Sequence, residues 1–229
     1  MKIKTTIIFL FSAIISNFGL GQDKTSSYPL QSIGNLLPIN TSIESVQYLG
    51  KAAVKVTELD PSAYYEDTFV RVKDINFKNG TIEVLLLGKL SNNAISQARG
   101  FVGIAFHING DNSKFDCIYI RPTNSRSDEQ LRRNHTVQYI SHPEYPWYKL
   151  REESPGKYEA YVDIDKDNWT KIKIVIKDKN ANLFFNDAEQ PTLIVNDLKQ
   201  NLTEKGSIGL WIGPGSVAYF SNLTIINDD

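Results

Sequence analysis

Alternating apolar and polar residues between Gly100 and Asn124 predict two strands joined by a turn rich in Gly, Asn and Asp. In the first strand, one face carries Val102, Ile104, Phe106 and Ile108, and the other carries Phe101, Gly103, Ala105 and His107. In the second strand, one face carries Ile118 and Ile120, and the other carries Phe115, Cys117, Tyr119 and Arg121. Branched apolar residues are typical of a core. The opposite face, with His107, Tyr119 and Arg121 beside small residues, therefore suits either a ligand or a half-exposed surface without a binding role.

The same period-2 alternation recurs along the chain between clusters of turn residues. It predicts strands over residues 46–58, 67–75, 81–87, 158–164, 169–177, 181–185, 192–195, 207–213 and 218–225. Asn79-Gly80 is a strong hairpin signal between two of these strands. Residues 125–156 are polar and predict a long loop, and no segment shows a sustained helical stripe. The pattern therefore predicts an all-β fold, a two-sheet antiparallel sandwich.

The N-terminal 21 residues are excluded from this predicted fold. Lys2 and Lys4 precede an apolar stretch that ends in small residues, which is the pattern of a secretory signal peptide. We therefore expect a secreted or periplasmic protein with no membrane association after cleavage. Residues 22–45 are rich in Ser, Thr, Asn and Pro and predict an irregular segment, which leaves residues 46–229 as one domain.

Charge and cysteine content exclude several classes of partner and site. The formal net charge is −1, and removal of Lys2 and Lys4 takes it to −3. A near-neutral chain lacks the basic footprint that nucleic acid binding needs. Cys117 is the single cysteine, so an intramolecular disulfide and most cysteine-based zinc sites are excluded.

A series of strand motifs resembles a known superfamily. The motifs are GTIEVLLLG, GFVGIAFHI, FDCIYIRPTN, NWTKIKIVI, ANLFFND and GSIGLWIGPGSVAYFSNLTI. In this order they are similar to the concanavalin A-like lectin/glucanase (LamG-like) jelly rolls. The resemblance implies a curved jelly-roll sandwich whose concave face and rim loops handle sugars, as enzymes in some members and as binding modules in others. It does not fix an activity, because one fold hosts many functions.

Carbohydrate binding is the function that requires the fewest special groups. Aromatic rings stack on sugar C–H faces, and planar polar side chains bond the hydroxyls. Gly209 and Gly213 are expected to leave open space around the Trp211 indole, on the non-core face of its strand. We expect a poly- or oligosaccharide to bind on the concave face, with residues 126–139 as its rim. The predicted ligand-binding residues are Tyr119, Arg121, Asn124, Tyr161 and Trp211.

A polysaccharide-degrading enzyme on the same face is the first alternative. A glycoside hydrolase needs two carboxylates about 5–5.5 Å or 6.5–9.5 Å apart, whereas Glu159 and Asp163 lie about 13 Å apart along a strand. A uronate lyase needs a cation for the carboxylate and groups that move protons. The segment RRNHTVQY has such residue types but lacks the Gln-x-His of some alginate lyases. The catalytic candidates are His107, Arg121, His135, Tyr139 and Glu159.

Whether the protein is an enzyme stays open at this point, and a non-catalytic protein-interaction domain is the second alternative. No metal or other cofactor is assigned. His107, His135 and His142 are not spaced as a ligand set. The turn NGDNS suits a structural calcium ion, and an ordinary hairpin turn explains it equally well.

Overall fold

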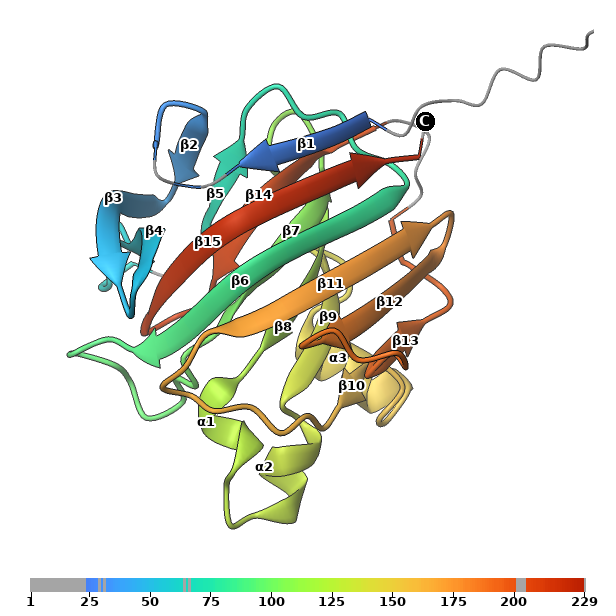
Figure 1. The fold of residues 1–229 in the computed structure, drawn as a ribbon. Coiled ribbons are helices and arrows are strands. Elements are labelled where there is room, and N and C mark those ends of the chain that lie inside the picture. The colour runs from blue at the N-terminus through green and yellow to red at the C-terminus, as the bar shows by residue number, and fades with distance from the viewer. Residues whose placement is uncertain are drawn as a thin grey trace, which may run out of the picture.

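The computed structural model describes residues 24–228 apart from 29, 31, 64, 66 and 201–204. Two antiparallel sheets pack face to face as a β-sandwich (Figure 1). This confirms the predicted all-β, two-sheet architecture. The predicted signal peptide, residues 1–21, lies outside the described residues.

The first sheet contains eight strands. Its order is β13 (Leu193–Val195), β12 (Asn180–Phe185), β11 (Thr170–Lys177), β6 (Gly80–Leu90), β15 (Ser216–Asn227), β4 (Lys51–Glu58) and β3 (Thr41–Tyr48). The eighth strand, β1 (Lys24–Tyr28), pairs with the second half of β15. The first and last strands of the described chain are therefore neighbours in one sheet.

The second sheet contains seven strands and carries the candidate site described below. Its order is β10 (Glu159–Ala160), β9 (Val137–His142), β8 (Phe115–Ile120), β7 (Val102–Ile108), β14 (Ser207–Ile212), β5 (Phe69–Val72) and β2 (Leu36–Ile39). In Figure 1 this sheet lies behind the eight-stranded sheet.

The N-terminal part of the fold differs from the prediction. Residues 22–45 were expected to be irregular, but this region contains β1, β2 and the start of β3. The stretch 46–58 is two strands, because Leu49 and Gly50 adopt positive φ angles of 44° and 74° and turn the chain back. β2 and β3 are edge strands with few buried side chains, so they show little apolar alternation.

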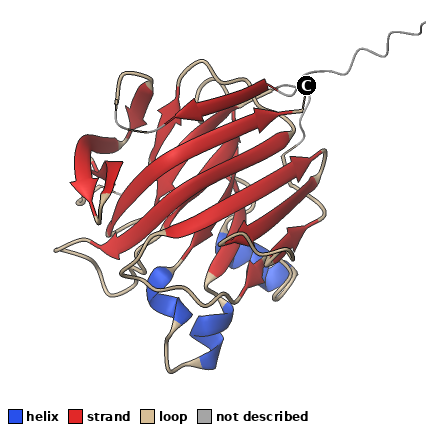
Figure 2. Cartoon of the chain, viewed as in Figure 1, coloured by secondary structure: helices blue, strands red, loops and turns tan. Residues whose placement is uncertain are grey.

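The expected loop over residues 125–156 is also more ordered than its sequence indicates. It contains β9, α2 (Gln130–Asn134) and α3 (Trp147–Glu153), and α1 (Pro122–Ser125) ends at its first residue. The three helices lie in the lower half of Figure 2. These helices have at most seven residues, which is too short for an apolar stripe to develop. In the described part of the chain, no helix has the length and apolar character needed to cross a membrane.

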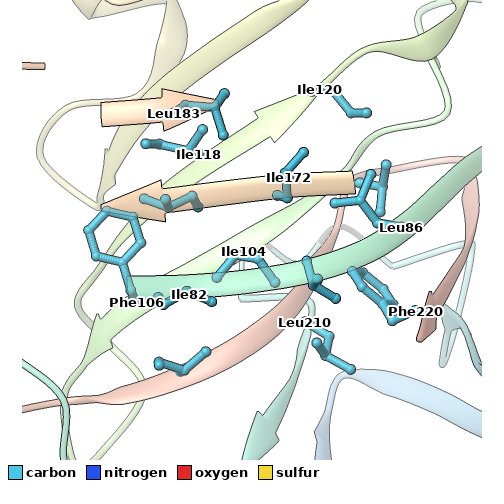
Figure 3. Packing of buried hydrophobic residues seen from close by; sticks show 14 of the residues in the cluster. Ile82, Leu86, Ile104, Phe106, Ile118, Ile120, Ile172, Leu183, Leu210 and Phe220 are labelled. Atoms are coloured by element: carbon cyan, nitrogen blue, oxygen red, sulfur yellow. The ribbon is translucent and has the colours of Figure 1, made fainter. Parts of the chain in front are cut away.

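The main core fills the space between the two sheets (Figure 3). Alternate residues of β7 and β8, among them Ile104 and Ile118, face Ile82 of β6 and Ile172 of β11 across this space. This confirms the predicted core face of Val102, Ile104, Phe106, Ile118 and Ile120.

One irregularity in β7 changes which face its last residues occupy. His107 has a φ of 56°, and the pairing of β7 with β14 shifts between Ser207 and Gly209. Such a bulge reverses the alternation of side chains. Ile108 was expected on the core face, but it packs with the apolar cluster on the outer face of the sheet. His107 correspondingly turns toward the interior of the sandwich.

Candidate functional site

A cavity of about 490 Å³ lies against the outer face of the seven-stranded sheet, the face turned away from the main core. Tyr119 of β8 and Trp211 of β14 form its floor. Most of its walls come from three connecting segments, residues 95–101, 121–135 and 142–151. These segments are distant in sequence, and the first two lead into or out of the β7–β8 hairpin.

A glycine between the two aromatic residues of the floor allows their rings to lie in contact. Gly103 pairs with Tyr119 on one side and with Trp211 on the other. The two rings meet above Gly103, with centroids 4.8 Å apart. A Cβ atom at position 103 would lie 2.5 Å from Tyr119 Cβ, so a side chain does not fit there. Phe101 extends the floor, with its ring centroid 6.0 Å from that of Tyr119.

The space around Trp211 is filled, which corrects the expectation that glycines leave it open. A Cβ at Gly213 would lie 2.7 Å from Phe101 Cβ, and one at Gly209 would lie 2.9 Å from Ile108 Cδ1. Only 6% of Trp211 is exposed. The glycines therefore allow close packing of the indole ring, which is held in a fixed orientation.

Arg121 is buried beneath the floor and holds it in place. Its Nη2 donates to the Tyr119 hydroxyl at 2.9 Å and to Gln138 Oε1 at 3.3 Å, and its Nη1 donates to the His135 carbonyl at 3.0 Å. Burial raises the pKa of Tyr119 to about 12, against the opposing effect of the Arg121 charge. The hydroxyl therefore stays protonated at neutral pH, and Arg121 acts on the cavity mainly by positioning Tyr119.

Glu159 is buried beside this arginine, although sequence parity suggested a solvated carboxylate. Its side chain is 3% exposed. It accepts from Arg151 Nε at 3.0 Å and from Arg151 Nη2, and its Oε1 lies 3.8 Å from Arg121 Nη1. His135 Nε2 lies 3.4 Å from Glu159 Oε2. Burial lowers the pKa of His135; Glu159 opposes this, and the charges of Arg151 and Arg121 add to it.

Three polar atoms at the cavity are buried without a hydrogen-bond partner among the described residues. They are Trp211 Nε1, Arg132 Nε and Asn124 Oδ1. Asn124 Nδ2 is bonded to the His135 carbonyl at 3.2 Å, which fixes the orientation of the amide. Buried polar atoms normally have partners. The protein therefore leaves two donors and one acceptor unpaired in residues that line the cavity.

Two of the proposed catalytic residues, His107 and Tyr139, lie elsewhere. His107 Nδ1 is 3.0 Å from Asp116 Oδ2, and His107 Nε2 is 2.8 Å from the Lys78 carbonyl. Tyr139 donates to Asp116 Oδ1 at 2.6 Å and accepts from the Lys199 backbone at 2.8 Å. This network is buried in the interior of the sandwich. The bulge at His107 turns the imidazole toward the interior, and Tyr139 lies on the core face of β9. The predictions that His107 lies on the ligand face and that Tyr139 lies on its rim are wrong.

Tyr161 is also outside the cavity. It is 40% exposed and accepts from Arg133 Nη2 at 2.8 Å. Its strand was predicted over residues 158–164, but β10 ends at Ala160, so parity does not extend to Tyr161. Of the predicted ligand-binding residues, the structure brings Tyr119, Arg121, Asn124 and Trp211 together at the cavity.

In the turn considered for calcium, the guanidinium group of Arg71 lies among the oxygen atoms. Arg71 Nη1 donates to the Asn109 carbonyl at 3.1 Å and to Asn112 Oδ1 at 2.9 Å. Asp111 accepts from Ser113 within the turn at 2.6 Å. Among the residues that the structure describes, no group of three or more His, Cys, Asp and Glu side chains could hold a metal ion.

Sequence reasoning missed Arg99 and Arg151 at the cavity. A local signal existed for Arg151, which lies four residues after Trp147 in α3 and therefore on the same face of the helix. Its guanidinium carbon is 4.7 Å from the centre of the Trp147 ring. Arg99 lies in a connecting segment without periodicity, so no local pattern predicted its position.

Comparisons with known proteins show the fold. No protein-family model and no curated protein matches the chain. It is similar to a Bacillus subtilis protein of unknown function with a galectin-like fold, at TM-score 0.53 and 10% identity over 90% of this chain and 98% of that one. It is also similar to carbohydrate-binding module CBM66 of Bacillus subtilis, at TM-score 0.50 and 9% identity over 84% and 92%. A third similar structure is the Crh5 transglycosylase in complex with NAG, at TM-score 0.51 and 13% identity over 90% and 84%.

These similarities and the two packed antiparallel sheets define a concanavalin A-like jelly-roll fold. The resemblance seen in the strand motifs is therefore confirmed for the fold. At such low identities the likeness extends to the fold alone.

Proposed function

We propose that this protein is secreted or periplasmic and binds a poly- or oligosaccharide in the cavity on the outer face of the seven-stranded sheet. The observation that supports this most directly is the combination of aromatic surfaces with unpartnered polar atoms in one cavity. Trp147 supplies an exposed ring surface and Tyr119 and Trp211 line the floor, while Asn124 Oδ1 and Trp211 Nε1 have no partner among the described residues. Sugars require this mixture of contacts.

The size of the cavity and the structural neighbours agree with this ligand class. A volume of about 490 Å³ lies within the range of small-molecule sites. Among proteins with a similar fold, one is a carbohydrate-binding module and one is a transglycosylase in complex with NAG.

A uronate lyase is the second candidate, because one pair of residues at the cavity suits proton transfer. His135, held neutral by its lowered pKa, contacts Glu159 beside the cavity. In such a reaction a base removes the C5 proton, a C4–C5 double bond forms, and the C4–O bond breaks as its oxygen gains a proton. Hydrolysis by two carboxylates has less support, because no Asp or Glu is among the described residues that line the cavity.

A polysaccharide panel tests the binding function and the enzymatic alternative together. The protein is incubated with neutral and acidic polysaccharides, and retention, ultraviolet absorbance and reducing ends are measured. Retention without product supports a binding protein. New absorbance from an unsaturated sugar supports the lyase, and reducing ends without absorbance support a hydrolase. Absence of all three signals across the panel would refute the proposal.

Two tryptophan variants locate the interaction. We expect Trp147→Ala to weaken retention about tenfold, because an exposed stacking platform is lost while the core is untouched. Trp169→Ala is the matched control, since Trp169 packs against Tyr48 away from the cavity. Equal loss in both variants, or no loss in Trp147→Ala, would place the site elsewhere.

A further inference from the structure

Four arginines line the cavity, and the described lining residues include neither Asp nor Glu. Glu159, which lies just behind the wall, already pairs with Arg151 and contacts Arg121. Arg99 and Arg132 are the other two arginines, and neither forms an ion pair with a carboxylate of the described residues. No salt bridge among the described residues therefore neutralises Arg99 or Arg132, and Glu129 acts on Arg99 only as a nearby charge.

Both arginines line the cavity and keep donors that have no hydrogen-bond partner among the described residues. Arg132 Nε is buried and has no partner among the described residues. Arg99 uses Nη1 to bond the carbonyls of Ser96 at 2.6 Å and Ala98 at 2.7 Å, and its Nε and Nη2 form no hydrogen bond with the described residues. Burial lowers the pKa of Arg99, the charges of Arg132 and Arg121 lower it further, and the charge of Glu129 opposes them. Arg99, Arg121 and Arg132 all line the same cavity.

Like charges held together in a half-buried cavity cost free energy unless an anion lies between them. A guanidinium group donates two parallel hydrogen bonds to a carboxylate or a sulfate group. We infer that the cavity is specific for acidic saccharides, and that Arg99 and Arg132 together bind a carboxylate or sulfate group of the sugar. This inference rests on the proposed saccharide-binding function and names its substrate class.

The remaining groups of the cavity contact the other parts of such a ligand. The aromatic floor faces the sugar ring, and Asn124 Oδ1 and Trp211 Nε1 serve its hydroxyl groups. The anionic group then occupies the side of the cavity formed by residue 99 and α2. A neutral sugar would fill the same floor but leave the two guanidinium groups unpaired.

The experiment measures affinity by calorimetry for matched pairs of ligands. Oligosaccharides of several polyuronates are compared with their carboxyl-reduced forms, and sulfated galactan oligosaccharides with their desulfated forms. We expect at least one acidic form to bind about tenfold more tightly or better than its neutral partner, because charge-assisted hydrogen bonds are lost in the latter. The difference should shrink as salt is raised. The two arms distinguish a carboxylate from a sulfate group as the recognised anion.

Charge-removing variants assign the effect to the two arginines. Arg99→Gln and Arg132→Gln should each remove most of the preference for the acidic form, because the affinity for the acidic form falls more than the affinity for the neutral form. Arg133→Gln is the matched control, because Arg133 is adjacent in α2 but bonds Tyr161 outside the cavity. Circular dichroism verifies that all three variants are folded.

The outcomes separate this inference from the function on which it rests. If neutral and acidic partners bind equally well, or if Arg133→Gln has the same effect as Arg132→Gln, the inference is refuted while saccharide binding stands. If no saccharide binds, both fail as stated. A final titration with inorganic sulfate, followed by tryptophan fluorescence, then shows whether the two arginines form an anion site that serves another ligand.

Discussion

Replacement of Glu159 by glutamine should destabilise the protein, because the buried carboxylate neutralises the guanidinium groups beside it. Removal of one partner of a buried ion pair typically costs about 3–5 kcal/mol. Arg151 keeps 32% of its side chain exposed and remains partly solvated after the change. We therefore expect a loss of about 2–3 kcal/mol in the free energy of unfolding. With a urea dependence of about 2–3 kcal/mol/M, the midpoint should fall by about 1 M.

The same substitution has a local electrostatic signature that a loss of packing would not produce. Glu159 raises the pKa of His135, whereas Arg151 and Arg121 lower it. Without the carboxylate, the pKa of His135 should fall further below its ordinary value. A proton NMR titration of the imidazole measures this shift in the folded variant.

Asp163→Asn is the control, since Asp163 lies four residues along the chain and its ion pair with Arg126 is exposed. Exposed pairs contribute little to stability, so this variant should unfold close to the wild-type midpoint. The reasoning is refuted if Glu159→Gln unfolds at the wild-type midpoint, or if the pKa of His135 rises.

Three further predictions test the parts of the fold that support the site. Gly103→Ala should cost about 1–3 kcal/mol in the free energy of unfolding, because the new Cβ meets Tyr119, whereas Gly110→Ala, in open space, should be near neutral. Thermal unfolding compares the two variants, and equal midpoints would contradict the close packing. Asp116→Asn should cost about 3 kcal/mol, because it breaks the buried contacts with His107 and Tyr139; a urea midpoint equal to that of wild type would show that this network is not stabilising. Burial raises the pKa of Asp197, but hydrogen bonds from Lys199, Lys157 and Tyr158 outweigh it and lower the pKa to about 2. The stability this provides is complete above the ordinary value of 3.8 and is lost as pH falls toward 2. Asp197→Asn should therefore flatten the pH dependence of unfolding in that window, and an unchanged slope would contradict the assignment.

The sandwich could be predicted from the sequence because its central strands alternate regularly. Ile104 and Ile118 face the core as their parity requires, and Tyr119 and Trp211 face the opposite side. The parity argument failed where the backbone departs from a regular strand. His107 has a positive φ angle, which interrupts the regular alternation of side chains that parity assumes.

The walls of the cavity could be predicted only in part. Asn124, predicted to bind the ligand, lines the cavity, and so do Arg132 and His135 of the predicted rim. Their contacts depend on how short helices fold back over the sheet, which is a tertiary property without a periodic pattern. The position of Arg99 and the burial of Glu159 arise from the same long-range packing.

The aromatic floor and the basic wall differ in how freely they can change. Tyr119 and Trp211 sit in register across Gly103, so an exchange at either ring disturbs three neighbouring strands. Arg99 lies in a connecting segment and Arg132 in the short helix α2, so neither belongs to a strand of the sandwich. A redesign that replaced these positive charges with negative ones would thus change the charge of the preferred ligand without changing the strands of the sandwich.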